Sequence, residues 1–523
     1  MEQRNILKER RNSIAVGGKG DGSGFACEKQ SVSGAVSQRA CVYCGARVVL
    51  NPITDAYHIV HGPIGCASYT WDIRGSLSSG SDLYRNSFST DLRETDIVFG
   101  GAKKLTAAID ELMETADPRP KLIFVYATCI VGVIGDDIEA VCRMTEEKYG
   151  IRAIPVKAPG FSGTKSQGYQ LACNAILELM RPHIPQPESE PVTAPAGEPV
   201  ATGGTAGVES ASHATGGAAG VPETAGKPAL VAGVGSASPA GGGAAGMAVA
   251  PGKRFGINIL GDYNLAGEMW IIKGYMAAVG IPVIATITGD SSYDKLIQAP
   301  TASLNIVQCA GSAVYLAESM EAEMGIPYVK VSFFGVEDTC ASIVRVADAL
   351  GDPDVSARAR AFVKERSAQV MPIIERFRPK LEGKKAAIFV GGGYKAISLI
   401  RQFNELGMRT VVVGTQTGKK DEYEVIGSIV QPDTIILDDA NPAELEQFML
   451  EKEADILVGG VKERPLAYKL GIAFCDHNHE RKAPLAGFEG IDNFVREINA
   501  SINSPVWRYL DKNIEKAKAA GAA

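Results

Sequence analysis

Three cysteines and two histidines stand close together near the N-terminus of the chain. Cys41 and Cys44 form a C-x-x-C pair. His58 and His61 form an H-x-x-H pair, and Cys66 ends the turn HGPIGC. Thiolates and imidazoles bind zinc and iron, and a C-x-x-C pair is also typical of a redox dithiol. The segment is therefore compatible with a zinc site, a dithiol or one side of a larger metal cluster.

The zinc and dithiol interpretations are the weaker ones. Two residues separate the histidines, whereas zinc fingers usually have three to five at this point. A thioredoxin-like dithiol is expected where a helix begins after a strand, and here the residues GARVVLNP follow the second cysteine. We therefore expect neither a structural zinc site nor a thioredoxin-like site.

A third cysteine, distant in sequence, favours a cluster. Cys129 ends the apolar run FVYATC and precedes the glycine-punctuated IVGVIGDD, a pattern expected where the backbone approaches a bulky group. Cys41, Cys66 and Cys129 all lie on predicted loops, which suits an iron–sulfur cluster held between elements. Three ligands are one fewer than the usual four, so a partner chain is a possible source of the fourth.

Three further segments carry weaker signals. Cys309 ends the run NIVQC and precedes AGSAVYLAESM, where helix amides favour a thiolate. FVGGGYKA (389–396) fits a dinucleotide fingerprint, but the next strand lacks the acidic residue that binds ribose. A glycine turn beside some other ligand is the preferred interpretation. CDHNHERK (475–482) is either a site or a solvated polar loop.

The elements around these residues follow one plan. Short apolar runs such as KLIFVYATC, SLNIVQC and KAAIFVGGG alternate with amphipathic stretches, which predicts parallel sheets covered by helices on both faces. We predict an α/β chain of three Rossmann-like, doubly wound domains. The predicted segments are an N-terminal extension (1–38), a first domain (39–184), a disordered Ala/Gly/Pro-rich insertion (185–252), a second domain (253–375), a third domain (376–486) and a C-terminal helical segment (487–523).

Composition limits the possible partners. The chain has 523 residues, 45% of them hydrophobic, which is enough for several buried cores. A net charge of −7 argues against nucleic acid or an anionic membrane as a partner. MEQRNILKERRNSIA is not a signal peptide, and no apolar run is long enough to span a membrane. We expect a cytoplasmic protein whose ten cysteines are free, catalytic or metal-bound.

Five motifs, taken in order, resemble the nitrogenase component 1 family. They are VHGPIGCASYTWDIRG, SFSTDLRETDIVFGGAKKL, YATCIVGVIGDDIEAVC, NIVQCAGSAVYLAESMEAEMGIPY and FCDHNHERKAPLAGFEG. The resemblance is strongest to the subunits on which the iron–molybdenum cofactor is assembled, and it covers all but the first few dozen residues and the insertion. It implies three Rossmann-like domains, in agreement with the pattern of elements.

The resemblance also implies metal ligands. Cys41, Cys66 and Cys129 match three ligands of a 4Fe–4S cluster at a subunit interface, and the partner NifN supplies the fourth. Cys44 has no matching role. Cys309 matches the cysteine that anchors the large cofactor of the family, which implies that it holds the iron–sulfur precursor of FeMo-cofactor.

Residues of a cofactor pocket follow from the same comparison. Asn478, or the flanking His477 or His479, stands where the catalytic subunit binds molybdenum through histidine. The resemblance also places Gly392 and Gly393 in the pocket. Lys462 and Arg464 are its remaining predicted residues, and we expect them to attract anionic homocitrate or the anionic cluster.

The implied function is a scaffold with no catalytic residues and at most weak reductase activity. The precursor made by NifB receives molybdenum and homocitrate with the help of the Fe protein NifH, and then passes to the apo MoFe protein. The chain is expected to form a heterotetramer with NifN. The alternative is the catalytic α subunit of a nitrogenase-like reductase, which carries a histidine pair where this chain has Tyr169 and Gln170.

Overall fold

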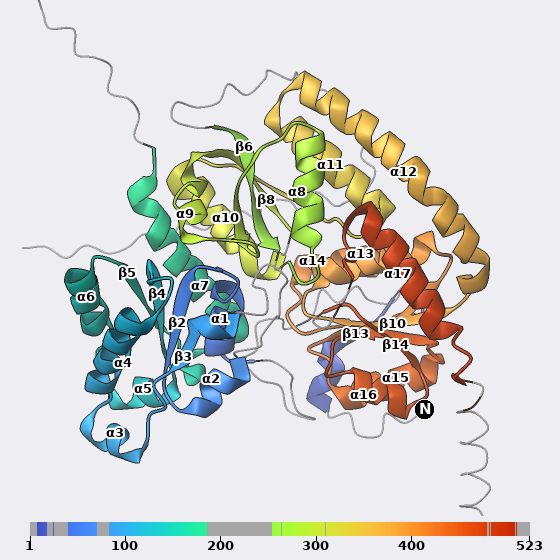
Figure 1. The fold of residues 1–523 in the computed structure, drawn as a ribbon. Helices are drawn as coiled ribbons and strands as arrows, with labels where there is room; N and C mark the ends of the chain where they lie inside the picture. The colour runs from blue at the N-terminus through green and yellow to red at the C-terminus, as the bar shows by residue number, and fades with distance from the viewer. Residues whose placement is uncertain are drawn as a thin grey trace, which may run out of the picture. The chain divides into compact units, whose positions relative to one another are not determined.

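The structure is a computed structural model in which Met1–Pro185 and Gly243–Ala523 form one compact unit (Figure 1). It describes residues 8–17, 25, 40–70, 83–185, 254–262, 264–308, 310–478, 481, 483–507 and 509. The predicted insertion beyond Pro185 lies outside the described residues, as do Cys309 and His479. Among the described residues, no helix is both long enough and apolar enough to cross a membrane.

The first sheet is parallel, with strand order β3-β2-β4-β5. Its strands are β2 (Ala56–His61), β3 (Ser87–Ser89), β4 (Leu122–Ala127) and β5 (Arg152–Lys157). Alternate strand residues pack against two separate hydrophobic clusters, one with α1 (Val42–Leu50) and α7 (Lys165–Met180), the other with α4 (Ala102–Thr115) and α6 (Ile138–Tyr149). Both faces are therefore covered. Short helices α2 (Ile64–Thr70), α3 (Glu94–Phe99) and α5 (Cys129–Ile134) lie between these elements.

The second sheet is also parallel, with strand order β7-β6-β8-β9. Its strands are β6 (Arg254–Asp262), β7 (Val283–Thr288), β8 (Ala302–Val307) and β9 (Tyr328–Lys330). Its helices are α8 (Glu268–Ala278), α9 (Tyr293–Leu296), α10 (Ala310–Met324) and α11 (Val336–Leu350). The long helix α12 (Pro353–Leu381) leads from this sheet to the third.

The third sheet has strand order β1-β12-β11-β10-β13-β14 and is parallel except for β1. Its strands are β1 (Ile14–Val16), β10 (Lys385–Val390), β11 (Arg409–Thr415), β12 (Ile435–Asp438), β13 (Ile456–Gly459) and β14 (Ala473–Asp476). Its helices are α13 (Gly393–Glu405), α14 (Lys420–Ile429), α15 (Pro442–Lys452), α16 (Arg464–Lys469) and α17 (Gly487–Ile502). The α/β class with parallel sheets is confirmed.

The N-terminal segment contributes an edge strand that the sequence pattern does not indicate. β1 pairs antiparallel with β12, and Ile14 lies opposite Leu437. Just before it, the buried Arg10 donates through Nε and Nη2 to the carboxylate of Glu444, both at 2.7 Å. Part of the segment predicted as an extension is thus anchored to the third sheet.

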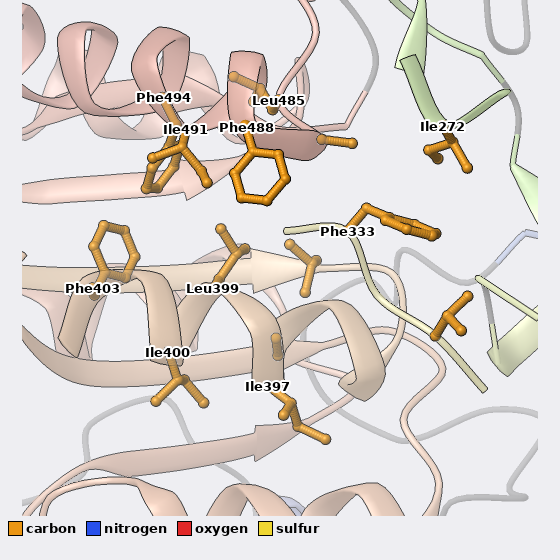
Figure 2. Packing of buried hydrophobic residues seen from close by; sticks show 14 of the residues in the cluster. Ile272, Phe333, Ile397, Leu399, Ile400, Phe403, Leu485, Phe488, Ile491 and Phe494 are labelled. Carbon is orange, nitrogen blue, oxygen red and sulfur yellow. The ribbon is translucent and has the colours of Figure 1, made fainter. Parts of the chain in front are cut away.

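Helix α17 belongs to the core. Figure 2 shows Phe488, Ile491 and Phe494 of α17 pointing toward Leu399 and Phe403 of α13. The rings of Phe403 and Phe494 are 5.6 Å apart. Because burying such a ring stabilises a domain by several kcal/mol, α17 holds the third sheet and its neighbouring loops in place.

Candidate cluster-binding sites

Three predicted ligands lie at or near the starts of three helices in the first domain. Cys41 is the N-cap residue of α1, Cys66 lies in the first turn of α2 and Cys129 is the first residue of α5. Helices α2 and α5 follow the parallel neighbours β2 and β4. Because carboxyl ends of parallel strands meet at one edge of a sheet, these two loops come together.

The turns that lead to Cys66 and Cys129 pack directly on each other. The Thr128 hydroxyl donates to the carbonyl oxygen of His61 at 3.0 Å. A Cβ atom added to Gly62 would lie only 2.1 Å from Thr128 Oγ1. Only glycine at position 62 allows this close approach, so the sequence HGPIGC specifies the contact between the two cysteine-bearing loops.

Cys41 and Cys129 meet on either side of Gly160. A Cβ atom added to Gly160 would lie 3.0 Å from Cys129 Sγ and 3.3 Å from Cys41 Sγ. The backbone N–H of Gly160 donates to Cys129 Sγ at 3.1 Å. Burial raises the pKa of the Cys66 thiol, and the neighbouring Cys129 and Cys41 raise it further. Cys41 and Cys129 therefore lie together beside Gly160, and Cys66 lies within range of their charges.

This site is more open than a single-ion site. Cys41 and Cys66 are half-buried and Cys129 is exposed. Within the described ranges, no group of three His, Cys, Asp or Glu side chains is close enough to hold one metal ion. Thiols that share a site at wider spacing suit a multi-iron cluster. Such a cluster is several ångströms across, and each of its irons takes one thiolate.

Both histidines of the H-x-x-H pair are engaged elsewhere. His58 is fully buried, its Nδ1 lies 2.8 Å from the Tyr126 hydroxyl, and its ring stacks on Phe124 and Tyr126. Burial holds the pKa of His58 well below its usual value. His61 Nε2 lies 3.1 Å from Asp136. The zinc-finger-like interpretation has no support, because both imidazoles belong to the buried strand β2.

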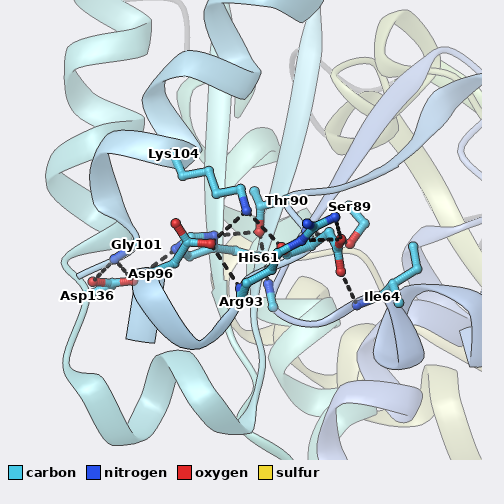
Figure 3. A network of polar contacts seen from close by, with 11 residues as sticks. His61, Ile64, Ser89, Thr90, Arg93, Asp96, Gly101, Lys104 and Asp136 are labelled. Carbon is cyan, nitrogen blue, oxygen red and sulfur yellow. Dashed lines mark hydrogen bonds and ion pairs between the residues drawn. The ribbon is translucent and has the colours of Figure 1, made fainter. Parts of the chain in front are cut away.

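A polar network fixes the positions of α2 and α5, as Figure 3 shows. The Asp136 carboxylate, just after α5, accepts from the Gly101 N–H and lies against the His61 ring. At the start of α2, the Ile64 N–H donates to Asp91 Oδ1 at 3.3 Å. The segment after α5 is thereby tied to the end of β2, and the start of α2 is tied to the turn after β3.

The C-x-x-C pair lies at the start of a helix, which we did not expect from the residues GARVVLNP. Val42–Leu50 form α1, and all nine of these residues are buried. Arg47 is the one charged residue among them, so the segment lacks the polar stripe that marks a surface helix. Cys41 Sγ and Cys44 Sγ lie 3.6 Å apart. The hydrogen bond between the two sulfurs lowers the pKa of Cys41 to about 6, and the same contact together with burial raises the pKa of Cys44.

The second predicted site is built around Cys309, which itself lies outside the described residues. β8 ends at Val307 and α10 begins at Ala310, so the flanking residues form the predicted turn from strand to helix. The intervening Gln308 is buried, and its Oε1 has no hydrogen-bond partner. The described residues thus place the end of a strand and the start of a helix on either side of position 309.

The glycine turn after β10 is open on one side. A Cβ atom added to Gly391 or Gly392 would meet nothing within 4 Å. Gly393 differs, because its added Cβ would lie 2.7 Å from the Glu422 Cβ and its N–H already donates to Glu422 Oε2. Of the two predicted glycines, Gly392 is therefore the one beside open space.

Lys395 joins this glycine turn to the CDHNH segment. Its Nζ donates to the His477 carbonyl oxygen at 2.7 Å and lies 3.5 Å from Asn478 Oδ1. Asn478 is half-buried, whereas the His477 ring is fully buried between Phe334 and Phe494. Asn478 is therefore better placed than His477 to face a ligand beside Lys395.

The two predicted cations behave differently. Lys462 is exposed. Arg464 Nη2 lies 3.3 Å from Asp476 Oδ2, so that carboxylate offsets part of its charge. The residues' assignment to an anion site stays a prediction. Lys395 is a third cation in this region. Sequence analysis missed it because its hydrogen bond joins residues 82 positions apart, and no local motif marks such a contact.

Known proteins are similar to this chain over most of its length. Residues 41–503 match the family "Nitrogenase component 1 type Oxidoreductase". The nitrogenase iron-molybdenum cofactor biosynthesis protein NifE of Clostridium pasteurianum is 56% identical over 97% of both chains. That of Methanosarcina barkeri is 47% identical over 95% of both. The solved structure "Nitrogenase Cp1 at pH 6.5" superposes with a TM-score of 0.76 at 27% identity and covers 96% of both chains. The chain therefore belongs to the nitrogenase component 1 type oxidoreductase family.

Proposed function

We propose that this chain is the scaffold subunit on which the iron–sulfur precursor of FeMo-cofactor is matured before transfer to the apo MoFe protein. The observation that carries the proposal is the meeting of three thiols at one loop cluster in a chain whose relatives are cofactor biosynthesis proteins. Identity to those relatives is about twice that to the solved nitrogenase chain, which favours the scaffold over a catalytic α subunit.

Cys41, Cys66 and Cys129 would hold a 4Fe–4S cluster. Gly160 fits this role, because any side chain there would enter the space between two of the sulfurs. Such a cluster supplies one-electron transfer when it is bound. Exposed Cys129 leaves room for a fourth ligand from a partner chain, NifN in our proposal.

An exposed apolar rim around the cysteines supports a partner at this position. Ile64 of α2 is 57% exposed, Val133 of α5 is 73% exposed and Phe161 beside Gly160 is 64% exposed. Apolar side chains gathered on a surface commonly mark a protein interface. Each of the three lies on an element that carries or faces a cysteine of the site, so a chain that covered them would reach the thiols.

The precursor would be held at the second site through Cys309. Gly392 and Asn478 would border it, and Lys395, Lys462 and Arg464 would attract the anionic cluster and homocitrate. A single thiolate leaves most of the cluster surface accessible, which suits a group that is modified and then released. NifB would supply the precursor, and the Fe protein NifH would assist the insertion of molybdenum.

The test is the metal content of the chain coexpressed with its family partner and purified without oxygen. Abundant iron with little molybdenum is expected of a scaffold that retains its precursor. Near-stoichiometric molybdenum would instead indicate the catalytic subunit, and the absence of iron would contradict both functions. Cys66→Ala and Cys309→Ala should each remove a different part of the iron, whereas Cys173→Ala, a buried core change, should remove none.

A further inference from the structure

Cys41 and Cys44 have the placement of a dithiol that forms a disulfide. Cys41 is the N-cap of α1 with extended backbone angles, and Cys44 is three residues further on. Disulfides typically join residues whose Cα atoms are about 4.4–6.8 Å apart, and the two cysteines are separated by about one turn of a helix, whose pitch is about 5.4 Å. The sulfurs are already 3.6 Å apart, so only a side-chain rotation separates them from bonding distance.

The two thiols differ in their access to solvent. Cys41 is half-buried at the open cysteine site, whereas Cys44 is 4% exposed and packs in the core of the first domain. A soluble oxidant therefore reaches Cys41 first, and the neighbouring Cys44 can then displace it. Cys142, by contrast, is buried in helix α6.

The geometry points to a reversible Cys41–Cys44 disulfide in the cluster-free chain, with glutathione disulfide or a similar small disulfide as the oxidant. The Cys41 thiolate attacks one sulfur of glutathione disulfide and releases one glutathione thiolate. Cys44 then loses its proton and attacks the Cys41 sulfur, which forms the intramolecular bond and releases the second glutathione. Two electrons pass from the two cysteines to glutathione disulfide, and the two cysteine protons are released.

This disulfide and the proposed cluster compete for Cys41. A cysteine bonded to sulfur cannot bind iron, so the pair must be reduced before the cluster site is complete. The disulfide also protects an accessible thiol from irreversible oxidation, since disulfides are reversed by thiols and sulfinic acids in general are not. The competition rests on the proposed function, whereas the disulfide itself rests on the geometry alone.

The experiment uses the full chain, freed of iron by a chelator and incubated with glutathione disulfide without oxygen. Free thiols are counted in denaturant, and the alkylated peptides are mapped by mass spectrometry. In the wild type the peptide map should show a Cys41–Cys44 linked peptide, whatever glutathione the exposed Cys129 carries. Cys44→Ser should carry glutathione on Cys41 instead. Cys142→Ala, which removes a buried helix cysteine elsewhere, should still show the Cys41–Cys44 linked peptide.

The outcomes separate the disulfide from the cluster. Stable glutathionylation of Cys41 in the wild type, or a disulfide from Cys41 to Cys66 or Cys129, would overturn the inference. Oxidised wild type should take up iron at this site only after reduction by dithiothreitol, and Cys44→Ala should need reduction only to remove glutathione. If the reduced wild type binds no iron at all, the proposed function fails, and the peptide map still decides the disulfide.

Discussion

Replacing Gly160 with alanine tests whether Cys41 and Cys129 hold one group between them. The added Cβ would lie 3.0 Å from Cys129 Sγ and 3.3 Å from both Sγ and Cβ of Cys41. These contacts are closer than carbon and sulfur normally approach, and overpacking of this kind costs about 1–3 kcal/mol. In the cluster-free chain the exposed Cys129 side chain can rotate away. Alanine also restricts the unfolded chain, which offsets about 0.4–1 kcal/mol. The free protein should therefore lose little stability.

The added methyl group should instead destabilise the cluster-bound state, because sulfurs bound to iron cannot rotate away. A penalty of about 1–3 kcal/mol corresponds to a roughly 5- to 150-fold weaker hold on the cluster. The assay is iron retention by the anaerobic complex during dialysis against a chelator, with urea unfolding of the cluster-free chain as a measure of stability. Gly65→Ala is the matched control, since its added Cβ meets nothing within 4 Å. Wild-type iron retention in Gly160→Ala would refute the placement of a cluster between Cys41 and Cys129.

Three further substitutions probe other contacts. Arg10→Met should cost about 3–5 kcal/mol in urea unfolding, because it leaves the Glu444 carboxylate buried without its partner; a loss below about 1 kcal/mol would mean that the N-terminal segment is not anchored. The pKa of His58 is lower in the folded chain than in the unfolded chain, so the unfolded chain binds more protons at acid pH. The free energy of unfolding should therefore fall as the pH drops below about 6.5, by up to about 1.4 kcal/mol per pH unit. His58→Gln should reduce that slope in urea titrations at pH 7 and 5.5, and an unchanged slope would assign it to other groups. Lys395→Met should release the segment at Asn478 and lower precursor iron several-fold, whereas Lys364→Met on α12 should not; equal iron in both variants would exclude Lys395 from the site.

The sequence predicts the fold class because that class depends on strong local patterns. Apolar runs such as the one that ends at Cys129 mark strands, and parallel topology brings the strand ends to one edge. The other two cysteines of the predicted set, Cys41 and Cys66, end no apolar run, and the family resemblance implied them as ligands. Helix α1 is different. Its nine residues are buried on every side between the sheet and α7, so no alternation of polar and apolar residues marks it as a helix.

Contacts between distant segments account for the rest. The bond of Lys395 to the His477 carbonyl and the approach of Asp136 to His61 join residues 82 and 75 positions apart. Neither member of such a pair carries a local signal of its partner, because the contact exists only after the sheets have formed. The three-residue strand β1 is likewise too short for a period to be recognised.

Strand β1 links the order of synthesis to the completion of the third sheet. Ile14 pairs with Leu437, so β1 is synthesised more than 400 residues before its partner strand β12. At about 5–20 residues per second, that interval is roughly 20 seconds to over a minute. Once β12 and its neighbours have been synthesised, the third sheet has an unpaired edge until β1 docks on it. An unpaired edge can pair with strands of other chains. The third sheet is thus most exposed to misassembly before β1 and β12 pair, and a change that weakens this pairing should affect the yield of soluble protein more than the metal sites.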